Sequence, residues 1–143
     1  MILLEGIQES MADNYLPQNV GRLVDKHIYS VSQLETLLFL RRYQDRNWTA
    51  HEIGNEFHTN DNAAMDILGR LAEDGFVKRF DAGRAPEFAY VPMSADMEAD
   101  IEALAEAYRN TRLRVVDRIY RKPEPDNSLR SIADSFLWRR DQE

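Results

Sequence analysis

The chain has 143 residues, the length of one domain that can bury its own hydrophobic core. Its 43 % hydrophobic and 30 % charged residues are typical of a globular domain, and the absence of cysteine excludes disulfides, thiolate metal sites and thiol nucleophiles. With 18 basic and 25 acidic residues the net charge is -7, which argues against a simple nucleic-acid coat. No apolar run approaches the roughly 18 residues of a membrane span, so we expect a cytoplasmic protein without a membrane partner.

After an N-terminal extension over 1–15, two helices are predicted. The first is a flanking helix within 16–30, with Pro17 in its first turn. Its apolar face consists of Leu16, Val20, Leu23, Val24 and Ile28. The second begins after Ser30 or Ser32 and opens a domain that we assign to 31–92.

A pair of short helices should follow a single extended residue, Trp48. Thr49 and Glu52 have the spacing of a capping box, which predicts the start of the first helix. Asn60 or Asp61 caps the second helix, which ends at Gly75. Its buried stripe comprises Ala64, Met65, Leu68 and Leu71.

Two strands and two more helices complete the prediction. Residues 76–80 and 87–91 alternate apolar and polar side chains and are joined by a turn-forming segment, which indicates a β-hairpin. A long helix is expected over 94–122, and Pro123 and Pro125 separate it from an amphipathic helix over 126–140.

The long helix carries an apolar stripe with heptad-like spacing. We expect a homodimer that uses this stripe together with the first helix. The interface residues are then Ile101, Leu104, Tyr108, Val115 and Ile119. The alternative is that the same helices pair within one chain.

The order of elements predicts a mainly α protein: a winged helix-turn-helix with one β-hairpin wing, flanked by N- and C-terminal dimerisation helices. The run from Leu71 to Val77 is typical of a recognition helix that leads into a first wing strand. The sequence here resembles the MarR-like winged-helix regulators of bacteria. It is also similar to small bacterial proteins with an Arg-rich C-terminal "LR-x-x-AD-x-F" helix, found here from Leu129 to Phe136.

The resemblance implies a dimeric transcription regulator that binds duplex DNA, with the recognition helix at about 60–74 in the major groove and the wing at about 76–91 on the backbone. Carried over by position, the recognition-helix contacts are Asn60, Asn62, Ala63, Asp66 and Arg70. The wing contacts are Lys78, Arg79 and Arg84.

The charge distribution favours an alternative. Between Thr49 and Gly75 one base, Arg70, stands against six acids, whereas residues 112–140 hold eight bases and four acids. Acidic side chains such as Asp61 and Asp66 are repelled by phosphates. The second hypothesis is therefore a winged-helix module that docks a protein partner through its acidic face and has no sequence-specific DNA binding.

Enzyme function is not expected, and we assign no catalytic residue, metal site or cofactor. The chain has no Gly-rich phosphate loop, nucleophile elbow or His–Glu metal motif. The histidines, His27, His51 and His58, do not have metal-ligand spacing. Trp48 is expected to be a core residue and His51 a solvated one.

Overall fold

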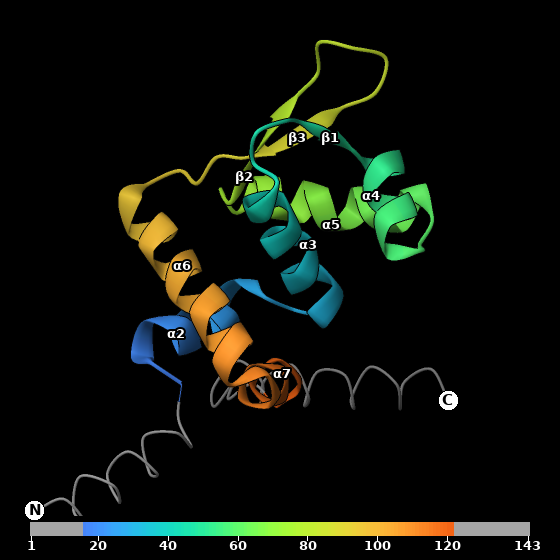
Figure 1. Ribbon diagram of the computed structural model, residues 1–143. Coiled ribbons are helices and arrows are strands. Elements are labelled where there is room, and N and C mark those ends of the chain that lie inside the picture. Colours follow the sequence, from blue (N-terminus) through green and yellow to red (C-terminus); the bar gives the residue numbers. More distant parts are fainter. Residues whose placement is uncertain (1–15, 122–143) are drawn as a thin grey trace, which may run out of the picture.

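The computed structural model describes residues 16–121, which form six helices and three short strands (Figure 1). The N-terminal extension and the helix expected over 126–140 lie outside the described residues. Helices α3, α4 and α5 lie with the sheet in one half of the molecule, and α2, α6 and α7 form the other half (Figure 1). No helix within 16–121 is long and apolar enough to cross a membrane.

The two N-terminal helices begin and end close to the predicted positions. Helix α2 covers Gln18–His27 with Pro17 as its N-cap, and α3 covers Val31–Arg42. The Ser30 hydroxyl accepts a hydrogen bond from the Gln33 amide at 3.0 Å, which satisfies one of the free N–H groups at the start of α3. Both helices bury an apolar face in a common core.

The predicted capping box is present at the start of α4, Ala50–Phe57. The Glu52 amide donates to the Thr49 hydroxyl at 3.2 Å, and a Glu52 carboxylate oxygen accepts from the Thr49 amide at 2.9 Å. His58 ends α4 in the left-handed conformation, with φ 56°. Helix α5, Asp61–Glu73, then begins at Asn60, whose side-chain oxygen accepts from the Ala63 amide at 2.8 Å.

The hairpin prediction is confirmed and the sheet gains a third strand. Strands β2, Val77–Phe80, and β3, Glu87–Tyr90, are antiparallel neighbours, and β1, Trp48–Thr49, pairs with the other edge of β3. The expected extended residue at Trp48 is thus part of a ladder, opposite Phe88. Helix–strand–helix–helix–hairpin is the winged helix-turn-helix order, so the predicted fold class is confirmed.

The helix expected over 94–122 is corrected by the structure, because the chain turns at Thr111. Helix α6 covers Ala95–Asn110 and α7 covers Arg112–Tyr120. Thr111 has φ -136° and ψ 52°, and both its amide and its hydroxyl donate to the Ala107 carbonyl. The new direction of α7 is stabilised by tertiary ion pairs, such as the one in which Arg118 donates to both carboxylate oxygens of Asp25, at 2.8 and 2.7 Å.

The expected interface residues also need correction. Four of them are buried inside the protomer, because α6 and α7 fold against α2 of the same chain: Ile101, Leu104, Val115 and Ile119. Tyr108 is half-buried, and its hydroxyl donates to Glu35 of α3 at 2.8 Å. Apolar spacing predicted correctly that these side chains are covered, but the covering helix is intramolecular.

Candidate nucleic-acid interface

Helix α5 presents a narrow polar stripe to solvent. Ala64, Leu68 and Leu71 face the core and leave Asn62, Asp66, Arg70 and Glu73 on the exposed side. Successive members of this stripe are three or four residues apart, so their side chains lie along one face. Asn60 is not part of the stripe, since its side-chain oxygen is used to cap the helix.

The three wing bases have different surroundings. Arg79 donates from Nε to both carboxylate oxygens of Asp81, at 3.0 and 3.2 Å. Lys78 is exposed, with its ammonium 5.3 Å from the centre of the Phe80 ring. Arg84 is exposed in the loop that joins β2 to β3. Within 16–121, neither Lys78 nor Arg84 forms an ion pair, so both charges are available to an external anion.

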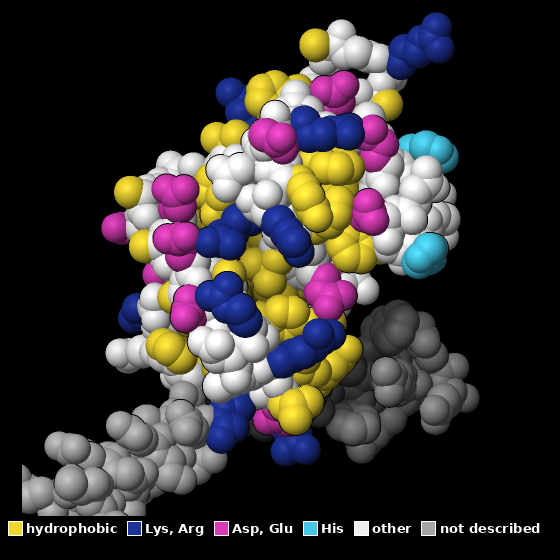
Figure 2. All heavy atoms as spheres, viewed as in Figure 1, with side chains coloured by type: hydrophobic (Ala, Val, Ile, Leu, Met, Phe, Trp, Pro, Cys, Tyr) yellow, Lys and Arg dark blue, Asp and Glu magenta, His cyan; other side chains and the backbone are white. Residues whose placement is uncertain are grey.

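Acidic side chains outnumber basic ones on the helix pair α4 and α5. Asp61 is exposed and pairs with His51 of α4, 3.1 Å away, while Glu56 and Glu73 are also exposed. His51 is exposed, as the sequence predicted. Figure 2 shows acidic and basic side chains interleaved over one face of the molecule instead of gathered in one basic patch. A polyanion that approaches α5 must therefore pass carboxylates as well as bases.

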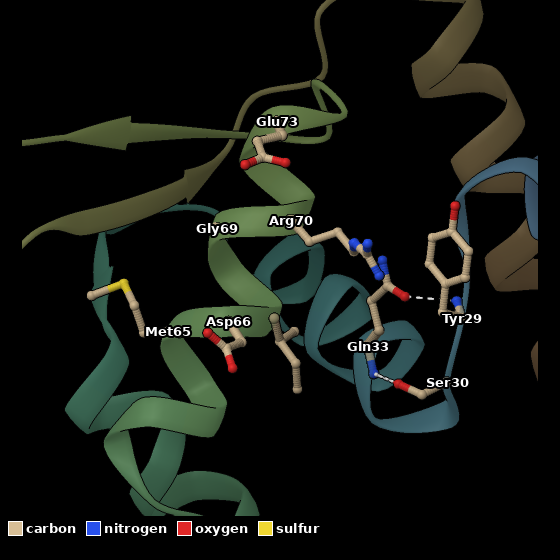
Figure 3. Close-up of a pocket in the computed structure, with 9 residues that line it drawn as sticks. Tyr29, Ser30, Gln33, Met65, Asp66, Gly69, Arg70 and Glu73 are labelled. Atoms are coloured by element: carbon tan, nitrogen blue, oxygen red, sulfur yellow. Dashed lines mark hydrogen bonds between the residues drawn. The ribbon is translucent and has the colours of Figure 1, made fainter. Parts of the chain in front are cut away.

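An open pocket of about 530 Å³ lies where α5 meets the connection between α2 and α3 (Figure 3). The α5 side contributes Asp66, Gly69, Arg70 and Glu73, and the connection contributes Tyr29. The Arg70 side chain reaches across to Tyr29, whose ring centre is 4.4 Å from the guanidinium carbon (Figure 3). The sequence pattern gives no sign that Tyr29 belongs to the site, because this residue lies outside the two helices and the wing.

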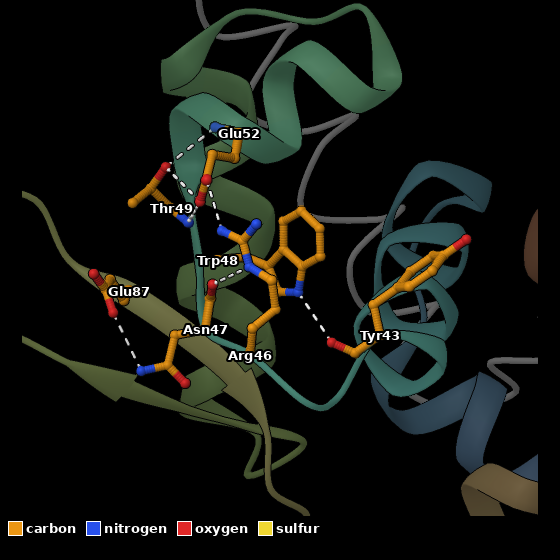
Figure 4. Close-up of polar contacts among 7 residues, drawn as sticks. All are labelled: Tyr43, Arg46, Asn47, Trp48, Thr49, Glu52 and Glu87. Atoms are coloured by element: carbon orange, nitrogen blue, oxygen red, sulfur yellow. Dashed lines mark hydrogen bonds and ion pairs between the residues drawn. The ribbon is translucent and has the colours of Figure 1, made fainter.

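A cluster of aromatic and charged groups supports the start of α4 (Figure 4). The Arg46 guanidinium lies 3.9 Å from the centre of the Trp48 ring and donates to Glu52 at 2.6 Å. Hydrogen bonding to Thr49 and to Arg46 lowers the pKa of Glu52 below its ordinary value. Trp48 is half-buried and its indole N–H donates to the Tyr43 carbonyl at 3.1 Å. These contacts give Trp48 a packing role, as expected from the sequence.

Solved structures of other proteins share the fold of this chain. No protein-family model and no curated protein matches the chain. Among solved structures, a mutant of MepR from Staphylococcus aureus bound to an oligodeoxyribonucleotide matches with a TM-score of 0.51 and 14 % identity, over 99 % of this chain and 96 % of MepR. The chain has the winged-helix fold of MarR-family regulators.

Two other structures agree with this assignment. One is a second crystal structure of MepR, a transcription regulator of the S. aureus multidrug efflux pump MepA. It has a TM-score of 0.51 at 15 % identity, over 99 % of this chain and 96 % of MepR. The heme sensor PefR from Streptococcus agalactiae, in complex with heme, has a TM-score of 0.51 at 12 % identity, over 95 % of this chain and 85 % of PefR. In this winged helix, α5 is the second helix of the helix-turn-helix and the β2–β3 hairpin is the wing.

Proposed function

We propose that the chain is a cytoplasmic, non-enzymatic transcription regulator that binds duplex DNA through α5 and the β2–β3 wing. The observation that carries the proposal is the winged helix itself, with an exposed polar stripe on α5 and two wing bases, Lys78 and Arg84, that have no acidic partner among the described residues. The structural neighbours add support, since MepR is a transcription regulator and one of its structures holds an oligodeoxyribonucleotide.

Each side chain of the proposed surface has a chemical role. Asn62 has the amide that pairs with adenine, Asp66 accepts from the cytosine amino group, and Arg70 grips guanine or phosphate. Lys78 and Arg84 neutralise backbone phosphates. Arg79 joins them by exchanging Asp81 for a phosphate, which costs little because both members of that pair are about half exposed. Asn60 keeps its capping oxygen and offers only its amide N–H₂ group.

Fluorescence anisotropy with labelled duplex at two salt concentrations tests the proposal. The logarithm of the affinity should fall linearly with the logarithm of salt concentration, and changing Lys78, Arg79 and Arg84 to Ala should flatten that slope by about one for each lost phosphate contact. Arg109→Ala is the matched control, because Arg109 lies on α6 and pairs with Glu106. A duplex affinity that the triple variant leaves unchanged contradicts the proposed wing.

The acidic face of α4 and α5 supports a second candidate, docking of a basic protein. Glu56, Asp61, Asp66 and Glu73 are exposed there against a single base, Arg70. The double variant Glu56→Gln with Asp61→Asn separates the two functions, since neither side chain has a role in reading bases. It should strengthen duplex binding if α5 approaches phosphates, and it should abolish retention of a protein partner in a pull-down if the carboxylates are the docking groups. Absence of duplex binding at physiological salt favours the docking function.

We further propose that the regulator is a homodimer that uses the outer face of α7. Leu113 and Tyr120 are 82 % and 70 % exposed, and Val116 lies between them on the same helical face. Light scattering should give twice the 16.7 kDa chain mass, and Leu113→Glu with Tyr120→Glu should give the monomer mass. Met93→Glu is the control, since Met93 is 72 % exposed but lies before α6. A wild-type mass of 16.7 kDa overturns the dimer.

A further inference from the structure

Arg70 is the sole Lys or Arg between Thr49 and Gly75, so its placement decides whether α5 offers any positive charge to a ligand. Its guanidinium does not lie against Asp66 or Glu73, the carboxylates one turn away on either side. No ion pair of Arg70 occurs within 16–121, although both acids line the same pocket. The guanidinium lies instead on the ring of Tyr29, 4.4 Å from its centre (Figure 3).

Tyr29 is held in place by the connection that bears it. The Gln33 side chain, only 2 % exposed, accepts from the Tyr29 amide at 2.7 Å and donates to the His27 carbonyl at 2.9 Å. The Tyr29 hydroxyl donates to the Lys26 carbonyl at 3.2 Å. The backbone and the far end of Tyr29 are thus both fixed before any ligand arrives. Tyr29 is 52 % exposed, and its ring contacts Arg70.

Stacking of this kind leaves the hydrogen-bonding capacity of arginine unused. A guanidinium that rests on an aromatic ring uses its flat face, while its five N–H donors point outward in the plane of the group. Those donors match two oxygens of one phosphate. A stacked arginine also loses less side-chain entropy on binding than a freely rotating one, because its rotamer is already restricted.

We propose that Tyr29 is a positioning residue for the DNA-binding surface: it holds Arg70 with its donors free, ready to clamp one backbone phosphate. The inference rests on the proposed DNA-binding function. It extends the binding surface beyond the recognition helix and wing to the α2–α3 connection. It also explains how an acidic recognition helix keeps one effective cation, since stacking on Tyr29 keeps Arg70 away from the neighbouring carboxylates.

A double-mutant cycle in the full-length chain tests this inference, with duplex affinity measured by anisotropy over a salt series. Arg70→Ala should weaken binding and lower the salt slope by about one. Tyr29→Leu should weaken binding about 2- to 5-fold, the range expected for an exposed cation–π contact, and keep the wild-type slope because Arg70 retains its charge. Tyr29→Phe keeps the ring and should bind within about twofold of wild type. In the Arg70→Ala background, Tyr29→Leu should cause no further loss.

Thermal unfolding of each variant identifies any general loss of folding. The inference is overturned if Tyr29→Leu weakens binding equally with and without Arg70, or if Tyr29→Phe weakens it as much as Tyr29→Leu does. Duplex binding that Arg70→Ala leaves unchanged in affinity and slope also overturns it, but leaves the proposed function intact. A wild-type chain that binds no duplex at low salt overturns both.

Discussion

Two helical glycines near the proposed DNA-binding surface have opposite surroundings. A Cβ atom on Gly54, in α4, would lie 2.8 Å from the Thr59 carbonyl oxygen, a backbone atom that cannot move without opening the α4–α5 turn. A Cβ on Gly69, in α5, would meet nothing within 4 Å. Gly54 is therefore required by the close approach of the two helices, whereas Gly69 only weakens the helix it belongs to.

The same substitution should consequently change stability in opposite directions at these two positions. Gly54→Ala should lower the free energy of unfolding by about 1–3 kcal/mol because of the backbone overlap. Gly69→Ala should raise it by about 0.5–1 kcal/mol through helix propensity. Urea unfolding followed by circular dichroism measures both. Equal effects of the two variants would contradict the packing described for the turn.

The start of α4 is capped from both sides by Thr49 and Glu52. Thr49 and Glu52 satisfy each other's amides, and Arg46 stacks on Trp48 while it donates to Glu52. Thr49→Ala should cost about 1 kcal/mol of unfolding free energy, the usual value of an N-cap. Thr59→Ala is the control, because its exposed side chain caps no helix, and it should stay within about 0.5 kcal/mol of wild type. An equal loss of unfolding free energy in the two variants would contradict the capping role of Thr49.

The same helix end should make stability depend on acid pH. The folded pKa of Glu52 is lowered, so the carboxylate stabilises the fold above its ordinary value of 4.5 and the stabilisation is lost as the pH falls below that value through the folded pKa. Glu52→Gln keeps a capping oxygen but loses the charge. The wild type should be more stable than this variant above pH 4.5, and urea midpoints should converge as the pH falls. A constant difference between pH 3 and 7 would contradict the assignment.

The elements that sequence predicted well are those with local determinants. The capping box at Thr49, the cap at Asn60 and the alternation of the hairpin each depend on residues a few positions apart, and all three are present. The turn at Thr111 has no such signal. Neither glycine nor proline is near it, and the apolar spacing continues across it, because the direction of α7 is stabilised by contacts to distant residues such as Asp25 and Glu35.

Across the whole molecule, Glu35 joins the two halves. This α3 carboxylate accepts from the Tyr108 hydroxyl of α6 at 2.8 Å and from Arg112 of α7 at 3.2 Å. Burial, together with the hydrogen bond and the charge of Glu35, raises the pKa of Tyr108 to about 12 from 10.0. Because the pKa of Tyr108 is higher in the folded than in the unfolded chain, its protonated hydroxyl stabilises the fold. This stabilisation is complete below pH 10 and is lost as the pH rises toward about 12.

Replacement of Tyr108 should therefore change how the free energy of unfolding depends on pH at alkaline pH. Tyr108→Phe should lower the free energy of unfolding by about 1 kcal/mol at pH 8, and its deficit should shrink between pH 10 and 11.5. Tyr43→Phe, at a 39 % exposed position that has no contact with Glu35 among the described residues, should leave the profile unchanged. Urea midpoints at each pH provide the measurement, and a deficit that is constant with pH would contradict the link through Glu35.

The site was less predictable than the fold, since its properties arise from residues that are distant in sequence. The wing bases could be named from the hairpin, but the pairing of Arg79 with Asp81 and the use of Asn60 as a cap depend on side-chain conformation. The stacking of Arg70 on Tyr29 joins residues 41 positions apart, which no periodicity reveals. The apolar periodicity also indicated that Ile101 and Leu104 are buried. It did not indicate whether a helix of the same chain or a helix of a dimer partner buries them.

The loop of the wing has a further consequence for protease sensitivity. Residues 81–85 are all exposed, and nothing lies within 4 Å of the position that a Cβ on Gly83 would take. Among the Lys and Arg residues within 16–121, trypsin should therefore cut first after Arg84, while Lys78 and Arg79 are protected by the β2–β3 ladder. If the wing lies on DNA, duplex should slow this first cut and leave tryptic cleavage elsewhere unchanged. The fragment pattern then reports occupancy of the wing in an unlabelled chain of natural sequence.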